Sequence, residues 1–313
     1  MIDISENTME KHKDTMIGGL LLSKSVNVIA ISASELVETA RSLHGLSRVC
    51  TAAMGRLLVA VSMMSARLKT ETDSITVTFA GGGPAGNLTA VGHRGGIVKG
   101  CITNPEIELP PNADGKLDVS GAVGKLGEMR VIRDLSLKEP YVGRCALVSG
   151  EIADDFANYF LVSEQQPSLV YLGVRVEPQT GRVRSAAGLM LTPLPDCPDE
   201  DIARLEALTG EIASLSKHID DGETLKDALD KLFEGMDFEV SDELLPEYRC
   251  DCGRERLERV IISLGEVELT DMIEQDGRAE IVCSFCRKKY EFTENDLRKL
   301  LDEAKKHGEE NDE

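Results

Sequence analysis

Tryptophan is absent from this 313-residue chain, and aromatic residues make up only 4% of it. A hydrophobic core must therefore be built from Val, Leu, Ile, Ala and Met, which the apolar content of 42% permits. The length is enough for roughly two domains. Basic residues are also scarce, with 35 Lys and Arg against 55 Asp and Glu, and the formal net charge is −20. This balance disfavours binding to nucleic acids and to anionic membrane surfaces, because both need clustered cations.

No apolar run approaches the roughly 18 residues of a membrane-spanning helix. The polar first residues are not followed by the apolar segment of a secretory signal. We therefore expect a cytoplasmic protein, in which thiols are reduced at rest. Eight cysteines are too few for a scaffold held together by disulfides. In a reducing compartment, paired cysteines more often indicate metal binding or redox chemistry.

Motifs of common enzyme classes are missing as well. The run Gly-Gly-Gly-Pro-Ala-Gly at residues 81–86 lacks the Gly-Lys-Ser/Thr of a P-loop and is predicted to be a turn between two strands. The five histidines are scattered, and no nucleophile-elbow motif accompanies them. We therefore predict a protein that is not an enzyme.

Residues 1–192 are predicted to form one α+β domain. Short segments rich in Val, Ile, Thr and aromatics, separated by Gly, Pro and Asn, are typical of strands. These segments are Asn27–Ile31, Ser74–Phe79, Arg130–Leu135, Cys145–Val148 and Leu169–Val176. Ser32 and Glu35 have the spacing of a capping box for a first helix. A second helix is expected from Ser47 to about Leu68, and its largely apolar composition, which includes three core methionines, indicates that it is buried.

Residues 193–246 are predicted to form an acidic, helical and metastable linker. Between Asp196 and Glu247 there are 17 acidic and 4 basic residues, so this segment carries more than half of the chain's negative excess. Apolar residues nevertheless recur at steps of three and four, as in an amphipathic helix. They are Ile202, Leu205, Leu208, Ile212, Leu215 and Ile219. A second series runs from Leu225 to Met236. Such helices need an apolar partner surface to remain folded.

Four of the eight cysteines form two close pairs. Cys250 and Cys252 make a C-x-C motif, and Cys283 and Cys286 make a C-x-x-C motif. Four thiolates in two such pairs can converge on one tetrahedral zinc ion, so we predict one Zn²⁺ per chain, bound in a small domain at residues 247–294. Residues 295–313 are predicted to be a C-terminal helix and an acidic tail. The other four cysteines are isolated and are not assigned a role: Cys50, Cys101, Cys145 and Cys197.

Two properties favour a redox switch at the four cysteines. Arg and Lys residues flank both pairs, and nearby cations stabilise the thiolates that oxidants attack. A disulfide across C-x-C closes a very small ring, so it is expected to be strained and easily reduced again. Two alternatives stay open on the residues alone. One is a binding or scaffold protein with a permanent zinc site, and the other is a thiol–disulfide oxidoreductase that uses Cys283 and Cys286.

The cysteine motifs stand inside a longer resemblance. The run EYRCDCGRERLERVIISLGEVEL, followed by EIVCSFCRKKYEF, resembles the C-terminal signature of the redox-regulated 33 kDa heat-shock chaperonin family (HslO type). In the N-terminal half, ARSLHGLS, GGGPAGNL and GEMRVIRDL resemble that family too. One departure is Val-Lys-Gly-Cys at residues 98–101, where the family often has Arg and Tyr around the glycine.

The resemblance implies an α+β N-terminal domain, a helical linker and a small zinc domain. It also implies an ATP-independent holdase that is inactive while the four reduced cysteines hold zinc. Oxidation would form the disulfides Cys250–Cys252 and Cys283–Cys286 and release zinc, and the zinc domain and linker would then unfold. The activated homodimer would bind unfolding client proteins and pass them to ATP-dependent chaperones. The linker residues listed above, and the surface that they cover, are the candidates for client binding.

Overall fold

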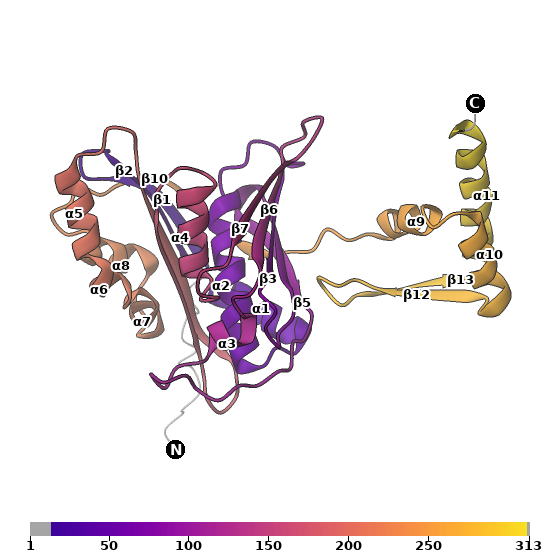
Figure 1. Ribbon diagram of the computed structural model, residues 1–313, viewed down its shortest axis with the longest axis horizontal. Coiled ribbons are helices and arrows are strands. Elements are labelled where there is room, and N and C mark those ends of the chain that lie inside the picture. Colours follow the sequence, from indigo (N-terminus) through magenta and orange to yellow (C-terminus); the bar gives the residue numbers. More distant parts are fainter. Residues whose placement is uncertain (1–13, 312–313) are drawn as a thin grey trace, which may run out of the picture. The chain divides into compact units, whose positions relative to one another are not determined.

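The computed structural model describes residues 14–311, with side chains described as far as residue 305. Its fold is α+β, as predicted, and the chain divides into two compact units between Arg249 and Cys250 (Figure 1). The strands of the first unit are β1 (Thr15–Leu21), β2 (Val26–Ser32), β3 (Ser74–Ala80), β4 (Leu88–His93), β5 (Ile97–Ile102), β6 (Glu128–Asp134), β7 (Tyr141–Ala146), β8 (Leu169–Val176), β9 (Val183–Pro193), β10 (Glu239–Leu244) and β11 (Glu247–Tyr248). Its helices are α1 (Ser34–His44), α2 (Arg48–Ser65), the 3₁₀ turn η1 (Arg94–Gly96), α3 (Val119–Val123), α4 (Ala153–Val162), α5 (Asp199–Ala207), α6 (Thr209–Ile212), α7 (Leu215–Asp220) and α8 (Leu225–Leu232).

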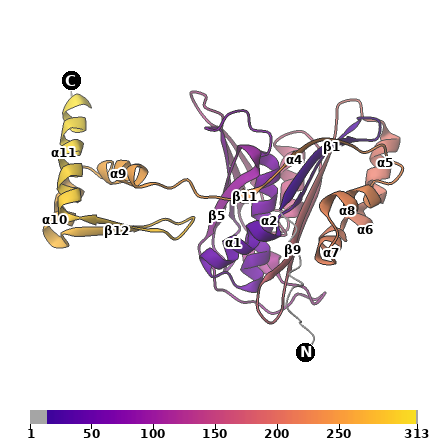
Figure 2. The same cartoon turned by 180° about the vertical axis from the view of Figure 1, so that it is seen from behind.

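The strands of the first unit form two sheets. One has the order β10-β1-β2-β9-β8 and the other β11-β5-β4-β3-β6-β7. Neighbouring strands are antiparallel, except that β11 runs parallel to β5. Helix α2 packs against strands of both sheets, and α5 to α8 lie on the other face of the five-stranded sheet (Figure 2). The loop at residues 81–87 joins β3 to β4, as the sequence predicted.

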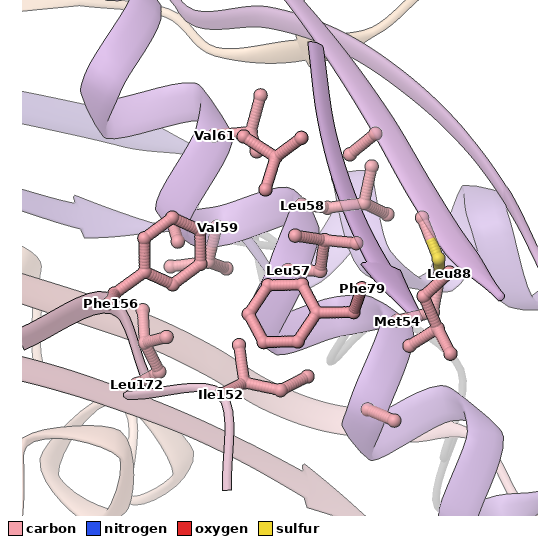
Figure 3. Packing of buried hydrophobic residues seen from close by; sticks show 14 of the residues in the cluster. Met54, Leu57, Leu58, Val59, Val61, Phe79, Leu88, Ile152, Phe156 and Leu172 are labelled. Atoms are coloured by element: carbon pink, nitrogen blue, oxygen red, sulfur yellow. The ribbon is translucent and has the colours of Figure 1, made fainter. Parts of the chain in front are cut away.

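Helix α2 forms the centre of the core. It begins after Ser47, whose hydroxyl accepts a hydrogen bond from the Cys50 amide at 3.2 Å, so the predicted cap is confirmed. Figure 3 shows Met54 of this helix near Phe79 and other buried side chains. By length and composition α2 could cross a membrane, although no such span was expected from apolar run lengths. Because 83% of it is buried inside the protein, it is a core helix.

The predicted capping box of α1 is wrong. Strand β2 continues through Ser32, so that this residue belongs to the strand, and the N-cap position falls on Ala33, which offers no side-chain hydrogen bond. The carboxylate of Asp14 takes over the role, accepting hydrogen bonds from the amides of Glu35 at 3.1 Å and Leu36 at 2.7 Å. A cap from a distant part of the chain leaves no local sequence pattern.

The acidic segment forms the four helices α5 to α8, and its apolar residues meet the five-stranded sheet. Leu205, Leu208, Ile212 and Leu215 are buried, Ile219 is partly buried, and Ile202 is 36% exposed. They pack on side chains of β1, β2 and β9. The end of the segment differs from the prediction, because residues 239–244 form the strand β10 instead of a helix. This stretch alternates apolar and polar residues only briefly and pairs with β1 along the sheet edge.

The second unit consists of α9 (Arg254–Ile262), α10 (Glu266–Gln275), β12 (Arg278–Val282), β13 (Lys289–Thr293) and α11 (Glu294–Asn311). The two strands form an antiparallel hairpin. Helix α11 continues through Asn311, so part of the predicted acidic tail is helical, and residues 312–313 lie outside the described residues. The core of this unit is small, and its buried apolar residues are Ile261, Leu269, Ile273, Tyr290, Phe292, Leu297 and Leu300.

Candidate metal centre

The four paired cysteines come together in the second unit. Their Sγ atoms all lie within 4.8 Å of one another. Cys250 Sγ is 3.8 Å from Cys283 Sγ, and Cys252 Sγ is 3.3 Å from Cys286 Sγ. Four sulfur atoms at about 2.3 Å from one tetrahedral zinc ion are about 3.8 Å apart. The quartet predicted from the sequence therefore has the residue types and the spacing that a zinc ion requires.

The two motifs reach this position from different local structures. Cys250 and Cys252 lie in the extended segment that precedes α9, and Cys283 and Cys286 lie in the turn between β12 and β13. In that turn the Cys283 amide donates to the Lys288 carbonyl at 2.9 Å, and the Arg287 amide donates to the Cys283 carbonyl at 2.9 Å. These two bonds fold the C-x-x-C backbone back on itself, so that both of its thiols face the C-x-C segment.

Tyr290 is a further member of this site, and we did not single it out from the sequence. Its hydroxyl lies 3.1 Å from Cys252 Sγ and donates to the Cys252 carbonyl at 3.2 Å. The sequence did contain a signal for a role of Tyr290 at this site. Tyr290 lies in β13, four residues after Cys286 and two before the buried Phe292. The hydrogen bond to Cys252 raises the pKa of Tyr290 to about 12. Tyr290 thus ties the C-x-C segment to the hairpin that carries the other two cysteines.

The thiols of Cys250, Cys252 and Cys286 differ in their readiness to ionise before a metal is bound. Burial raises the pKa of Cys250 and that of Cys286. Burial also acts to raise the pKa of Cys252, but hydrogen bonds with Tyr290 and the neighbouring thiols outweigh it and lower this pKa to about 7. One thiolate is therefore available near neutral pH. That is the species that binds metal or attacks an oxidant.

The cations around the quartet are held by acidic partners. Arg254 forms ion pairs with Glu258 at 3.1 Å and Asp296 at 3.0 Å, and its guanidinium lies 4.4 Å from the centre of the Phe292 ring. Arg256 pairs with Asp251 at 3.2 Å. These exposed pairs contribute little stability by themselves. Because each guanidinium is paired with a carboxylate, the net positive charge beside the cysteine segments is small, and the lowered pKa of Cys252 comes from hydrogen bonds instead.

The isolated cysteines lie in the first unit, apart from this quartet. Cys50 and Cys145 are buried, and burial raises the pKa of both thiols. The Asn158 amide donates to Cys145 Sγ at 2.9 Å. Cys101 is half-buried, and Cys197 packs against the apolar cluster beneath the linker helices. Within the described part of the chain, only the quartet gathers three or more residues of metal-binding type.

Comparison with known proteins identifies the family. Residues 14–293 match the Hsp33 protein family. A 33 kDa chaperonin of Alkaliphilus metalliredigens is 43% identical over 281 residues, which cover 90% of this chain and 96% of that protein. A 33 kDa chaperonin of Clostridium botulinum is 42% identical over 290 residues, which cover 92% and 98% of the two chains. The crystal structure of the 33 kDa chaperonin from Thermotoga maritima has a TM-score of 0.84 at 35% identity, covering 93% of this chain and 98% of that one.

These relatives confirm the resemblance seen in the sequence motifs. Hsp33 proteins are non-enzymatic holdase chaperones, so the expectation that the protein is not an enzyme is confirmed and the oxidoreductase alternative is excluded. Cysteine clusters of the kind found at residues 250–286 are consistent with redox or zinc regulation. The match extends over both units, from the capping Asp14 to the last strand of the hairpin. This chain belongs to the Hsp33 family of 33 kDa chaperonins.

Proposed function

We propose that this protein is a redox-regulated, ATP-independent holdase of the cytoplasm, inactive while Cys250, Cys252, Cys283 and Cys286 bind one Zn²⁺. The observation that supports this best is the convergence of four sulfur atoms within 4.8 Å in a member of a chaperone family. Bound zinc would stabilise the four thiolates and hold the two cysteine segments together. We further propose that residues 1–192 form the chaperone core, 193–246 the linker, 247–294 the redox-switch domain and 295–313 a terminal helix with its tail.

Activation is an oxidation of thiols by peroxide or a comparable two-electron oxidant. A thiolate attacks the O–O bond of the peroxide and becomes a sulfenic acid, and the second oxygen leaves as water after protonation. A neighbouring thiol then displaces water from the sulfenic acid and forms the disulfide. Each disulfide therefore consumes one peroxide and two thiols and yields two waters. After two such reactions no thiolate of the quartet is left to bind metal.

We propose the pairs Cys250–Cys252 and Cys283–Cys286. The sulfur separations of 3.8 Å and 3.3 Å are measured across the motifs, so proximity in the reduced protein does not by itself favour these pairs. The support is chain connectivity, since a pair inside one short segment can still close after the two segments have separated. Peptide mapping without reduction tests the assignment. A cross-linked peptide that joins the segment around residue 250 to that around residue 283 would contradict it.

Metal loss should then unfold the second unit and release the linker. Structural zinc supplies roughly 10–16 kcal/mol of apparent folding free energy in small peptides, and the second unit has only a small apolar core of its own. The linker carries mutually repelling acidic residues and is held by the burial of side chains such as Leu205 and Leu215. Its release would uncover the sheet face formed by Ile17, Val28 and Leu189. This face and the linker's apolar residues are the proposed client-binding surface.

The test is a joint measurement of zinc content and of client aggregation on one sample, before and after peroxide treatment. We expect the release of one zinc per chain, formation of a homodimer, and suppression of light scattering by a heat-denatured client over the same time course. A Cys101→Ser variant, altered outside the quartet, should behave like the parent. Transfer of the client to an ATP-dependent chaperone should follow after reduction.

Two results would contradict the proposal. If zinc stays bound after peroxide treatment and the reduced form binds client, the metal is a permanent structural one. Oxidised, zinc-free protein that lets the client aggregate as fast as buffer does would rule out the holdase activity.

A further inference from the structure

The strand β10 is attached to the first unit in a different way from the rest of the linker. Helices α5 to α8 bury apolar side chains such as Leu205, Leu215 and Leu229 against the sheet. In β10 no residue is buried, and Val240 is 43% exposed. What holds this strand is its antiparallel pairing with β1, which runs from Met16 opposite Leu244 to Leu20 opposite Glu239.

Side-chain contacts add little to this pairing. Arg67 forms an ion pair with Asp242 at 2.6 Å, and Lys24 forms one with Glu239 at 3.2 Å, but all four side chains are substantially exposed. Exposed ion pairs of this kind contribute little stability. Leu244, at the end of the strand, is partly buried against the core around α2. The remaining interactions are backbone hydrogen bonds, which any extended segment can form. Apart from an apolar residue at the position of Leu244, the edge occupied by β10 therefore accepts extended strands of many sequences.

Strand β1, in contrast to β10, is held in the protein by buried side chains. It pairs with β2 along its whole length, and its side chains are buried on both faces of the sheet. Met16 belongs to the core around α2, whereas Ile17 and Leu21 belong to the cluster beneath the linker helices. Strand β1 is thus built into the core independently of β10. When β10 leaves, β1 becomes an edge strand with a row of unpaired backbone N–H and C=O groups.

Two glycines shape this edge. The pairing of β1 with β10 shifts its register between Gly18 and Gly19. A Cβ atom at Gly18 would lie 2.4 Å from Arg67 Nη2, and one at Gly19 would lie 2.6 Å from the Glu239 carbonyl oxygen. The missing side chain at Gly19 lets the backbone of β10 approach closely, and the one at Gly18 leaves room for the side chains of Arg67 and Asp242. Beside this edge, Ile17 lies on the apolar face that the linker helices cover.

We propose that the outer edge of β1, occupied by β10 in the inactive protein, is a client-binding site for an extended segment of unfolded polypeptide. Such a segment takes over the backbone hydrogen bonds of β10, and its alternate apolar side chains continue the sheet face next to Ile17 and Leu21. The acidic β10 is then an internal competitor that keeps the edge closed. This inference rests on the proposed function for the release of the linker, and it adds the chemistry by which a client is held.

Hydrogen exchange measured by mass spectrometry on the full-length protein tests the proposal. Three states are compared, namely reduced, oxidised, and oxidised with an unfolded client, and client aggregation is recorded for the same preparations. Oxidation should increase exchange in residues 15–21 and 239–244 together. The client should then restore protection of residues 15–21, whereas residues 239–244 should continue to exchange.

Two exchange patterns would overturn the proposal without affecting the proposed function. In one, the oxidised protein suppresses aggregation but the client leaves exchange in residues 15–21 unchanged. In the other, residues 15–21 and 239–244 are both protected in the oxidised dimer before any client is added, which means that β10 of the same or a second copy fills the edge. Absence of any suppression of aggregation would instead count against the proposed function.

A peptide competition provides a second test. A peptide with the sequence of residues 237–245 should compete with the client for the edge of the oxidised protein and reduce its holding capacity several-fold at high excess. The matched control carries Val240→Pro and Asp242→Pro, which remove backbone donors and disrupt the extended pairing. The control peptide should have no effect. Equal effects of the two peptides, or no effect of either, would overturn the proposal.

Discussion

Tyr248 and Gly100 are joined by two hydrogen bonds through a single hydroxyl group. Tyr248 Oη donates to the Gly100 carbonyl at 2.9 Å and accepts from the Gly100 amide at 3.2 Å, although the two residues are 148 positions apart. His44 Nε2 lies 3.1 Å from the same oxygen. The ring of Tyr248 is buried against the core of the first unit. Because Tyr248 lies two residues before Cys250, these bonds fasten the chain just after the linker to β5.

Replacement Tyr248→Phe should loosen this attachment. The variant keeps the buried ring but removes the hydroxyl partner from both backbone groups of Gly100, which should cost about 1–3 kcal/mol. We expect a lower free energy of unfolding of the reduced, zinc-loaded protein in urea, and faster hydrogen exchange at residues 247–249. Tyr141→Phe is the control, since the Tyr141 side chain is 49% exposed and its change should stay within about 0.5 kcal/mol. Equal stability of the two variants would contradict the role given to Tyr248.

Replacing Leu205, Leu208 and Leu215 together by Ser should give partial chaperone activity without oxidant. All three side chains are buried against the five-stranded sheet, and removal of a buried leucine side chain costs roughly 2–5 kcal/mol. The linker should therefore detach while zinc remains bound, which is checked by measuring client aggregation and zinc content under reducing conditions. Ile202→Ser changes an apolar residue at the exposed rim of the same helices and should remain inactive. A triple variant that fails, like the reduced parent, to suppress client aggregation would show that linker docking does not restrain chaperone activity.

Asp14 should lower the free energy of unfolding as the pH rises, which is the opposite of the usual effect of a carboxyl group. Burial raises its pKa from 3.8 to about 6, despite the hydrogen bonds from Leu36 and Glu35. The folded state therefore binds the proton more tightly than the unfolded state. Its stabilising contribution is complete below pH 3.8 and is lost as the pH rises to 6 and beyond. The shift corresponds to a loss of about 3 kcal/mol.

Asp14→Asn removes this titration and provides the measurement. Relative to the parent, the variant should be more stable at pH 7 than at pH 4.5, because only the parent must ionise a buried group. Urea unfolding of both proteins at the two pH values gives the difference. A stability difference that is the same at both pH values would contradict the raised pKa.

Removing zinc with a chelator under reducing conditions should unfold the second unit and leave the core of the first unit folded. Its apolar core contains few large side chains, among them Ile261, Leu269 and Phe292, and bound metal is expected to supply most of its folding free energy. Hydrogen exchange should rise throughout residues 250–305, whereas α2 in the core of the first unit should keep its protection. Restoring zinc should reverse the change. A chelated protein whose second unit retains its protection would show that the cysteines do not depend on metal for their arrangement.

Features that depend on neighbouring residues could be predicted from the sequence. The cysteine quartet is an example, because C-x-C and C-x-x-C each fix two ligands within one short segment. The cap at Ser47 and the buried helix after it follow from local composition in the same way. The apolar spacing from Leu205 to Leu215 predicted helices with one buried face, which the sheet covers.

Features that join distant residues were decided by the tertiary structure alone. Asp14 caps α1 in place of Ser32. Strand β10 pairs with the edge of β1 although it lies within the linker that was predicted to be helical. Tyr290 reaches Cys252 across the second unit. These contacts depend on which backbone groups and side chains lie next to one another after folding. A single polar residue carries no periodic signal that would identify its partner. The sequence therefore determined the four cysteines of the candidate metal site, and only the folded chain determined what surrounds and restrains them.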